Sequence, residues 1–365
     1  MSVLWLILLT LALAFAQAVV FKLCDMKKLT YDRYFAQNTG YEGQRIELLE
    51  TIRNAKPLPV PWLKAESRIP KELAFEKEKS ESSDEVSGGL YHRSLFFLAP
   101  MSAVTRHHEV TLKHRGVYNA GSVALTAGDL FSLAHSESER DCTCVMTVYP
   151  AILSESELPD PANRWLGEAV VRRWIMPDPF LVNGIRAYAA GDSLKDVHWK
   201  ASARTGELRV KVHDYTSDPK VFVMLNIQTS ENQWTDVSSQ YEESMEQGIR
   251  IAATLCLRAI NMGLNAGFAS NACLRGKENS GECVFVPSAG GSAQADKLLE
   301  TMAQMLLHRE KTFPTYLSEL RSLTGEDILI ISAYDSEELS RAIHQLRAQG
   351  NTVNVMRLEL GRKAQ

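Results

Sequence analysis

Residues 221–227 read VFVMLNI, an unbroken apolar run with the length of a β-strand. The next periodic segment, residues 239–262, repeats apolar side chains at the spacing of a helix. A continuous apolar strand followed by a long helix is typical of a parallel sheet covered by helices. Residues 221–262 therefore predict a strand-helix unit of an α/β domain.

The same alternation continues along the rest of the sequence. Further expected strands are GLNAGFAS (263–270), ECVFVP (282–287), DILIIS (327–332) and NTVNVMRLE (351–359). Further expected helices are SAQADKLLETMAQMLLH (292–308) and SEELSRAIHQLRAQG (336–350). Because strands alternate with helices, we expect a doubly wound α/β domain over residues 218–362.

The chain before this domain has a different pattern. Its segments are short, rich in Val, Leu, Thr and aromatic residues, and separated by Pro, Gly and polar clusters, which is typical of strands. The expected strands are residues 45–54, 62–69, 90–99, 106–116 and 142–150. The charged run at 76–89 is expected to be an exposed loop. We therefore expect a β-rich, sandwich-like module over residues 41–150, and a linker over residues 151–217.

The start of the sequence is apolar, and residues 2–21 carry no charged side chain. About 20 such residues suffice for a helix to cross a bilayer, so we expect a transmembrane helix over residues 1–22. A signal peptide cleaved near Ala14–Ala16 is the alternative, although no positive residue precedes the apolar run. Basic residues follow the run, which favours a single-pass protein of the inner (cytoplasmic) membrane whose body faces the cytoplasm. The fold class expected for the whole chain is α+β.

The composition excludes some partners. Lys+Arg 40 against Asp+Glu 44 gives a formal net charge of -4, which argues against a general attraction to nucleic acid. The six cysteines lack the spacing of a disulfide framework, and this is consistent with a reducing compartment.

A dense motif precedes the α/β domain. It consists of Gly184-x-Arg186-x-Tyr188, Gly191-Asp192, His198-Trp199-Lys200-x-Ser202-Ala203-Arg204, Gly206-Glu207-Leu208 and Lys211. This block resembles the hallmark of the domain-of-unknown-function family 58. Upstream, Arg115-Gly116-Val117-Tyr118 and the imperfect Asp129-Leu130-Phe131-Ser132-Leu133 are similar to two further elements of that family.

The resemblance implies a fold and a partner. In that family the motif is followed by a von Willebrand factor A-like α/β domain, and the strand at 221–227 lies where such a domain should begin. Family members are membrane proteins usually encoded beside MoxR-type AAA ATPases, so the resemblance implies such an ATPase as partner.

Many A-like domains bind Mg²⁺ through a D-x-S-x-S loop and a later Asp. The matching positions of this sequence are Asn226, Gln228, Ser230 and Ala333. Because no carboxylate occupies them, we expect no metal and no cofactor. Asp335 is close enough to contribute a ligand, but an Asp before a helical segment is more typical of an N-cap.

The residues of the motif allow several interpretations. Gly191 and Asp192 are typical of a turn in which the carboxylate accepts amide hydrogens. Trp199 is expected to be a buried core or interface anchor. The basic group Lys200, Arg204, Arg209 and Lys211 is suited to a phosphate, to the acidic patch of a partner, or to the chain's own Asp192, Asp196 and Glu207. Internal pairing is the favoured interpretation, so that the segment clamps the β-rich module to the α/β domain.

Two functions remain open. The favoured one is a membrane-anchored, non-enzymatic adaptor that works with a MoxR-type ATPase in the assembly or activation of another complex. Its candidate interaction residues are Arg186, Tyr188, Gly191, Asp192, His198, Trp199, Lys200, Ala203 and Arg204. The alternative is a hydrolase-type enzyme that uses Asp196, His198 and Lys200 in an inter-domain cleft.

Overall fold

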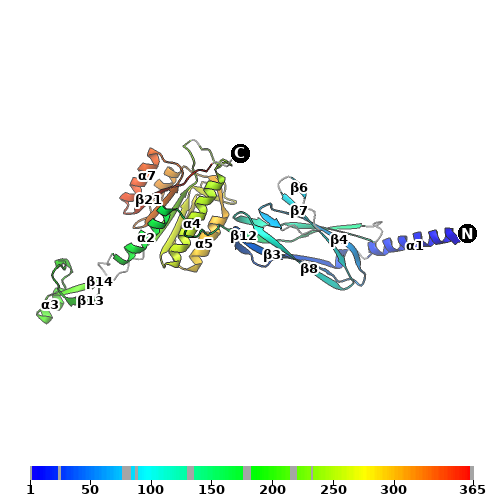
Figure 1. The fold of residues 1–365 in the computed structure, drawn as a ribbon, viewed down its shortest axis with the longest axis horizontal. Coiled ribbons are helices and arrows are strands. Elements are labelled where there is room, and N and C mark those ends of the chain that lie inside the picture. Colours follow the sequence, from blue (N-terminus) through cyan, green and yellow to red (C-terminus); the bar gives the residue numbers. More distant parts are fainter. Residues whose placement is uncertain are drawn as a thin grey trace. The chain divides into compact units, whose positions relative to one another are not determined.

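Figure 1 shows the computed structural model, whose chain divides into two compact units, Met1–Ala151 and Ile152–Gln365. The structure describes residues 2–23, 26–75, 84–86, 89–129, 135–175, 182–213, 220–231 and 233–361. Most of the expected loop at 76–89 and of the family element at 129–133 lies outside the described residues.

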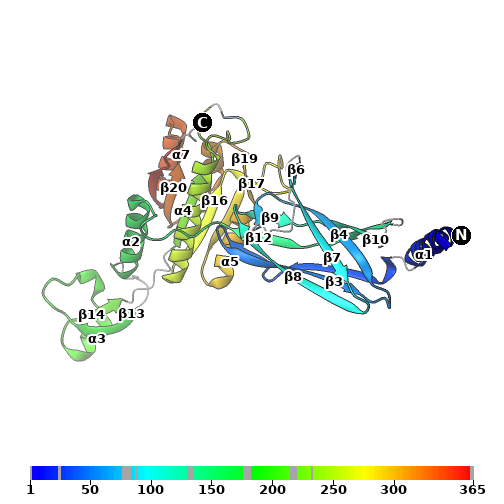
Figure 2. The ribbon, with the colours of Figure 1, turned by 45° about the vertical axis from the view of Figure 1, so that its right-hand side comes forward.

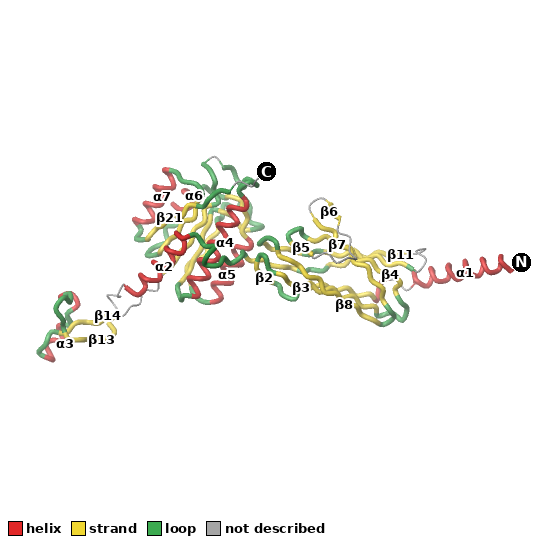
Figure 3. The backbone as a smooth tube through the Cα atoms, viewed as in Figure 1, coloured by secondary structure: helices red, strands yellow, loops and turns green. Residues whose placement is uncertain are grey.

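After helix α1 (Ser2–Leu23) and the short turn η1 (Met26–Lys28), the first unit consists of strands (Figure 3). One sheet has the order β1-β3-β8-β5, with β1 (Leu29–Phe35), β3 (Arg45–Asn54), β8 (Ser102–Leu112) and β5 (Leu73–Phe75). A second has the order β11-β10-β4-β7-β6, with β11 (His135–Asp141), β10 (Ser122–Gly128), β4 (Val60–Ile69), β7 (Gly89–Leu98) and β6 (Asp84–Val86). A third has the order β2-β12-β9, with β2 (Thr39–Tyr41), β12 (Val145–Tyr149) and β9 (Gly116–Asn119).

Alternating side chains bury one face of each large sheet of this unit. One apolar cluster combines Ile52 of β3 with Leu63 of β4 and Phe96 of β7, so the two sheets share a core. A second cluster combines Leu48 of β3 with residues of β8, β9 and β12. The five strands expected between residues 45 and 150 all form, and β3 has the predicted bounds. Period-two burial explains this agreement, because it follows directly from the pleat of a strand.

The transmembrane expectation is wrong. Residues Ser2–Leu23 do form a helix. However, in the part of the chain that the structure describes, no helix has both the length and the apolar character needed to cross a membrane.

A five-stranded sheet forms the centre of the second unit, with helices on both of its faces (Figure 2). Its order is β18-β16-β15-β20-β21, with β18 (Val284–Ala289), β16 (Asn265–Ser270), β15 (Lys220–Asn226), β20 (Asp327–Ser332) and β21 (Thr352–Arg357). The helices of this unit are α2 (Asp160–Ile175), α3 (Trp199–Thr205), α4 (Glu242–Asn261), α5 (Ser292–Gln304), α6 (Phe313–Glu319) and α7 (Glu337–Ala348). Residues of α6 and α7 pack on Phe222 and Ile330 of the sheet, whereas α4 contacts β15 and β16.

The sheet of the second unit is mixed. β16, β15, β20 and β21 run parallel, but β18 runs antiparallel to β16. A parallel neighbour needs a long crossover, usually through a helix. The described connection between β16 and β18 contains only the short strand β17 (Ala272–Leu274), so the chain returns in the opposite direction.

The last part of the segment predicted as a helix at 292–308 forms a strand instead. Helix α5 ends at Gln304, and β19 (Met305–Arg309) pairs with β17. The apolar residues of MLLH fit a strand as well as a helix, and pairing with β17 decides between them.

The fold class predicted for the whole chain is therefore wrong. The α+β class with a transmembrane helix and a von Willebrand factor A-like domain does not describe a strand-rich chain whose described residues form six sheets. The expected linker at 151–217 also carries regular structure, namely α2, α3, the turn η2 (Leu194–Asp196) and the strands β13 (Val182–Ala187) and β14 (Arg209–His213).

Candidate functional site

The motif at 184–211 forms a small hairpin unit. β13 and β14 pair antiparallel, and the chain between them forms η2 and α3 (Figure 3). Gly206 ends α3 in the left-handed conformation, with φ 73°. The side chains of the motif are therefore carried by one hairpin and by the short helix between its two strands.

Asp192 fixes the turn after β13. Its carboxylate accepts two hydrogen bonds from the Arg186 guanidinium, both 2.6 Å long, and one from the amide of Ala189 at 2.8 Å. Gly191 has φ 110°, which confirms the predicted turn. The Arg186 guanidinium holds the pKa of Asp192 below its usual range. Because the pair is bidentate, it orients the loop that leads into η2.

His198 is the N-cap of α3. Its Nδ1 accepts a hydrogen bond from the amide of Ala201 at 3.1 Å. This bond gives the imidazole a structural role and occupies the nitrogen that faces the helix. The hydrolase alternative requires His198 to act as a base, but the capping bond uses the lone pair of Nδ1, and in a ring whose Nδ1 accepts, Nε2 carries the proton and can only donate.

Trp199 is not the buried anchor that the sequence predicted. It is 67% exposed, and Leu194 of η2 is 66% exposed. The physical reason is that α3 has only seven residues, none of which is buried, so the helix does not pack against a core that could cover Trp199. Two large apolar side chains therefore face outward near the start of this helix.

The basic residues of the hairpin unit also differ from expectation. Asp192 pairs with Arg186 rather than with the basic group, and Arg209 approaches Glu207 at 3.8 Å. Within the described residues, the side chains of Lys200 and Arg204 form no ion pair. Two ion pairs of this unit are therefore a bidentate one between Arg186 and Asp192 and a longer one between Arg209 and Glu207.

The positions that match a metal loop hold a network of amides. The Asn226 side chain donates to Ser332 Oγ at 2.9 Å, and its Oδ1 accepts from the amide of Gln228 at 2.9 Å. Gln228 Oε1 accepts from the amide of Phe313 at 3.1 Å, and its Nε2 donates to the carbonyl of Ser230 at 3.2 Å. These side chains connect the ends of β15 and β20 to α6.

The expected cap at Asp335 is one residue off. The N-cap of α7 is Ser336, whose Oγ accepts from the amide of Leu339 at 3.1 Å. Both residue types are strong caps, so composition alone could not decide between neighbours.

We expect Ser336→Ala to lower the free energy of unfolding of the second unit by about 1 kcal/mol, because it removes this capping bond. Asp335→Ala is the matched control and is expected to cost less. Urea unfolding of both variants, followed by circular dichroism, measures the difference, and a larger cost for Asp335→Ala would contradict the assignment.

A pocket lies at the carboxyl ends of β20 and β21. Its lining includes Tyr334, Asp335, His344, Arg347 and Arg357. The position is one where open α/β sheets often hold ligands. None of Asp196, His198 and Lys200 lines this pocket, so it does not provide the cleft that the hydrolase alternative requires.

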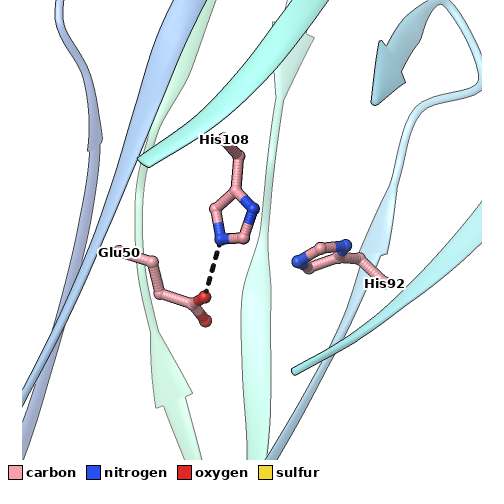
Figure 4. A group of neighbouring side chains, drawn as sticks. All are labelled: Glu50, His92 and His108. Atoms are coloured by element: carbon pink, nitrogen blue, oxygen red, sulfur yellow. Dashed lines mark hydrogen bonds and ion pairs between the residues drawn. The ribbon is translucent and has the colours of Figure 1, made fainter. Parts of the chain in front are cut away.

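The structure also contains a buried polar cluster that is not among the predicted sites. Glu50 of β3, His108 of β8 and His92 of β7 converge inside the first unit (Figure 4). His108 Nε2 lies 3.1 Å from Glu50 Oε2, and Tyr31 donates to Glu50 Oε1 at 2.7 Å. Ser94 Oγ donates to Glu50 Oε2 at 3.2 Å and lies 3.1 Å from His92 Nε2.

Burial and hydrogen bonding set the charges of this cluster. Burial alone would raise the pKa of Glu50, but the hydrogen bonds from His108 and Tyr31 outweigh it and hold the pKa below its usual range. Burial lowers the pKa of His92 to about 4. Near neutral pH the cluster therefore contains a carboxylate and, at His92, a neutral imidazole.

A signal for this cluster is present in the sequence. In RIELLETIRN (45–54), alternation places Ile46, Leu48, Glu50 and Ile52 on one face, so Glu50 stands where an apolar residue is expected. The same period places His92 and Ser94 inward with Phe96 on β7.

Comparisons with known proteins support the family resemblance. Residues 184–355 match the family model described as Protein of unknown function DUF58. The matched range begins in β13 and ends in β21, so it contains the hairpin unit and the mixed sheet. No curated protein sequence matches the chain.

Three solved structures illustrate the structural matches. A CARDB domain from Pyrococcus furiosus is 14% identical, covers 34% of this chain and 96% of its own, and has a TM-score of 0.22. A non-cellulosomal cohesin from Archaeoglobus fulgidus is 16% identical, with 36% and 94% covered and a TM-score of 0.21. The collagen-binding subdomain of an Enterococcus faecalis surface protein is 10% identical, with 34% and 98% covered and a TM-score of 0.23.

The TM-scores of these three structures are too low to support an inference about this chain.

Proposed function

We propose that this chain is a non-enzymatic interaction protein that binds its partner through the hairpin unit at 182–213. The observation that carries the proposal is the exposure of Trp199 and Leu194. Exposed Trp side chains are frequent energetic centres of protein interfaces, because they bury a large area with little loss of conformational entropy.

The charges around Trp199 favour an acidic partner surface. Lys200 and Arg204 are exposed, and Arg186 is already oriented by Asp192. Basic side chains beside an apolar centre are typical of an interface in which charge speeds association and apolar contact provides affinity.

The family resemblance supports a MoxR-type AAA ATPase as the partner, with a role in assembling or activating another complex. The proposal requires the two proteins to share a compartment. The fixed Arg186–Asp192 pair and the capped helix α3 would present a preformed surface, so little ordering would accompany binding.

We expect the purified full-length chain to bind the purified MoxR-type ATPase encoded in the same genome. Trp199→Ala should weaken this binding at least tenfold, since it removes the exposed apolar centre. Biolayer interferometry with and without ATP measures the affinity.

Trp234→Ala is the matched control, because Trp234 is 87% exposed but lies outside the hairpin unit. It should bind like the wild-type chain. Absence of binding by the wild type, or an equal effect of both substitutions, would refute the proposal.

A further inference from the structure

The Glu50 cluster lies where the first unit should be apolar. Glu50 is 2% exposed, and along β3 its inward-facing neighbours Leu48 and Ile52 belong to two separate apolar clusters. His92 and His108 are also buried. Placing a carboxylate and two imidazoles together in a core is costly unless these groups satisfy one another or bind an ion.

We propose that Glu50, His92 and His108 form a binding site for one transition-metal ion, with Zn²⁺ as the ion to test. The three ligand atoms lie within 4.8 Å of one another and come from three strands of the two large sheets (Figure 4). Around a tetrahedral Zn²⁺, bond lengths of roughly 2.0–2.1 Å place two ligand atoms about 3.3 Å apart. The separation of 3.1 Å between Glu50 and His108 is already close to that spacing.

The chemistry of the donors selects the class of ion. Two imidazoles and one carboxylate suit Zn²⁺ and related divalent ions, whereas Mg²⁺ and Ca²⁺ prefer oxygen ligands alone. His92 and His108 would each supply one ring nitrogen, and Glu50 would supply one carboxylate oxygen.

Neighbouring groups are arranged as supports for the ligands. Tyr31 donates to Glu50 Oε1, so it holds the carboxylate through the oxygen that His108 and Ser94 do not contact. Phe75 stacks on the His92 ring at a centroid distance of 4.8 Å. Ser94 Oγ contacts both Glu50 and His92, a position from which it could ligate the ion or orient a water ligand.

A metal-free hydrogen-bond network is the competing explanation. In that case His108 and Glu50 form a buried ion pair or a neutral hydrogen bond, and the side chains serve only to join the two sheets. The metal explanation requires the folded chain to bind a divalent ion stoichiometrically and to need His92 and His108 for that binding. The metal-free explanation predicts no such binding.

The test uses the full-length chain without an affinity tag, stripped of metal with a chelator. Zinc chloride is titrated against a chromophoric competitor, and bound zinc is counted by mass spectrometry. We expect one Zn²⁺ per chain, and at least tenfold weaker binding in His92→Gln and in His108→Gln. His107→Gln is the matched control, since His107 is the exposed neighbour of His108 on β8, and it should bind like the wild type.

Equal affinity in all of these chains, or no stoichiometric zinc in the wild type, would overturn the proposal. A second measurement does not depend on the folding of the variants. Co²⁺ bound to the wild-type chain should give the visible absorption of a four-coordinate site with nitrogen and oxygen ligands. A strong thiolate-to-cobalt band would mean that cysteines hold the ion and would also overturn the proposal.

Discussion

Replacing Glu50 with alanine in the metal-free chain is expected to destabilise the first unit by about 3 kcal/mol or more. The substitution leaves three buried donors, on Tyr31, Ser94 and His108, without their shared acceptor. A buried donor that loses its partner costs the full desolvation of that group, roughly 1–3 kcal/mol. The cost therefore comes from the groups left behind rather than from the lost side chain.

The measurement must follow the first unit by itself, because two compact units need not unfold together. Hydrogen exchange of the β3 amides in increasing urea reports on this unit. Glu47→Ala is the matched control on the same strand, where the side chain is 61% exposed, and it should change stability by at most about 0.5 kcal/mol. Equal effects of the two substitutions would contradict the assigned role of the cluster.

A double-mutant cycle tests the mechanism. If Tyr31→Phe is made first, one stranded donor is already removed, so Glu50→Ala should cost less in that background by about 1 kcal/mol. Independent effects of the two substitutions would mean that the Tyr31 to Glu50 hydrogen bond contributes little.

The strands of the first unit could be predicted because burial alternates along them. For β3 this pattern gives both ends correctly. It also places Glu50 on the inner face, but it does not reveal which other inward residues will face it. That depends on register, which pairs Leu48 with His108 between β3 and β8, and on the packing of β7 from the other sheet. The residue pattern of one strand contains neither the register with its neighbour nor the packing of the opposite sheet.

In the second unit the errors arise where tertiary pairing decides local structure. Met305–Arg309 becomes a strand because β17 offers it a partner, although the preceding helical pattern continues into it. Trp199 is exposed because its helix is short, which residue type alone does not predict. The turn at Gly191 and Asp192 was predictable, since glycine and aspartate determine it within a few residues.

Gly267→Ala is expected to destabilise the second unit by about 2 kcal/mol or more. A Cβ at this position would lie 2.5 Å from two atoms of the Phe222 ring and 2.7 Å from Ser288 Oγ. Phe222 is fully buried and pairs with Gly267 across β15 and β16, so the ring cannot move without disturbing the core.

Gly167→Ala provides a control of opposite sign. Gly167 lies on the exposed face of α2, and a Cβ there would meet nothing within 4 Å. Alanine should therefore stabilise the helix by up to about 1 kcal/mol. Urea unfolding, monitored through hydrogen exchange of β15, should show the two alanine substitutions shifting the transition in opposite directions. If Gly267→Ala were neutral, the close approach of the Phe222 ring to the β16 backbone would be wrong, and with it the packing of the strand pair at the centre of the sheet.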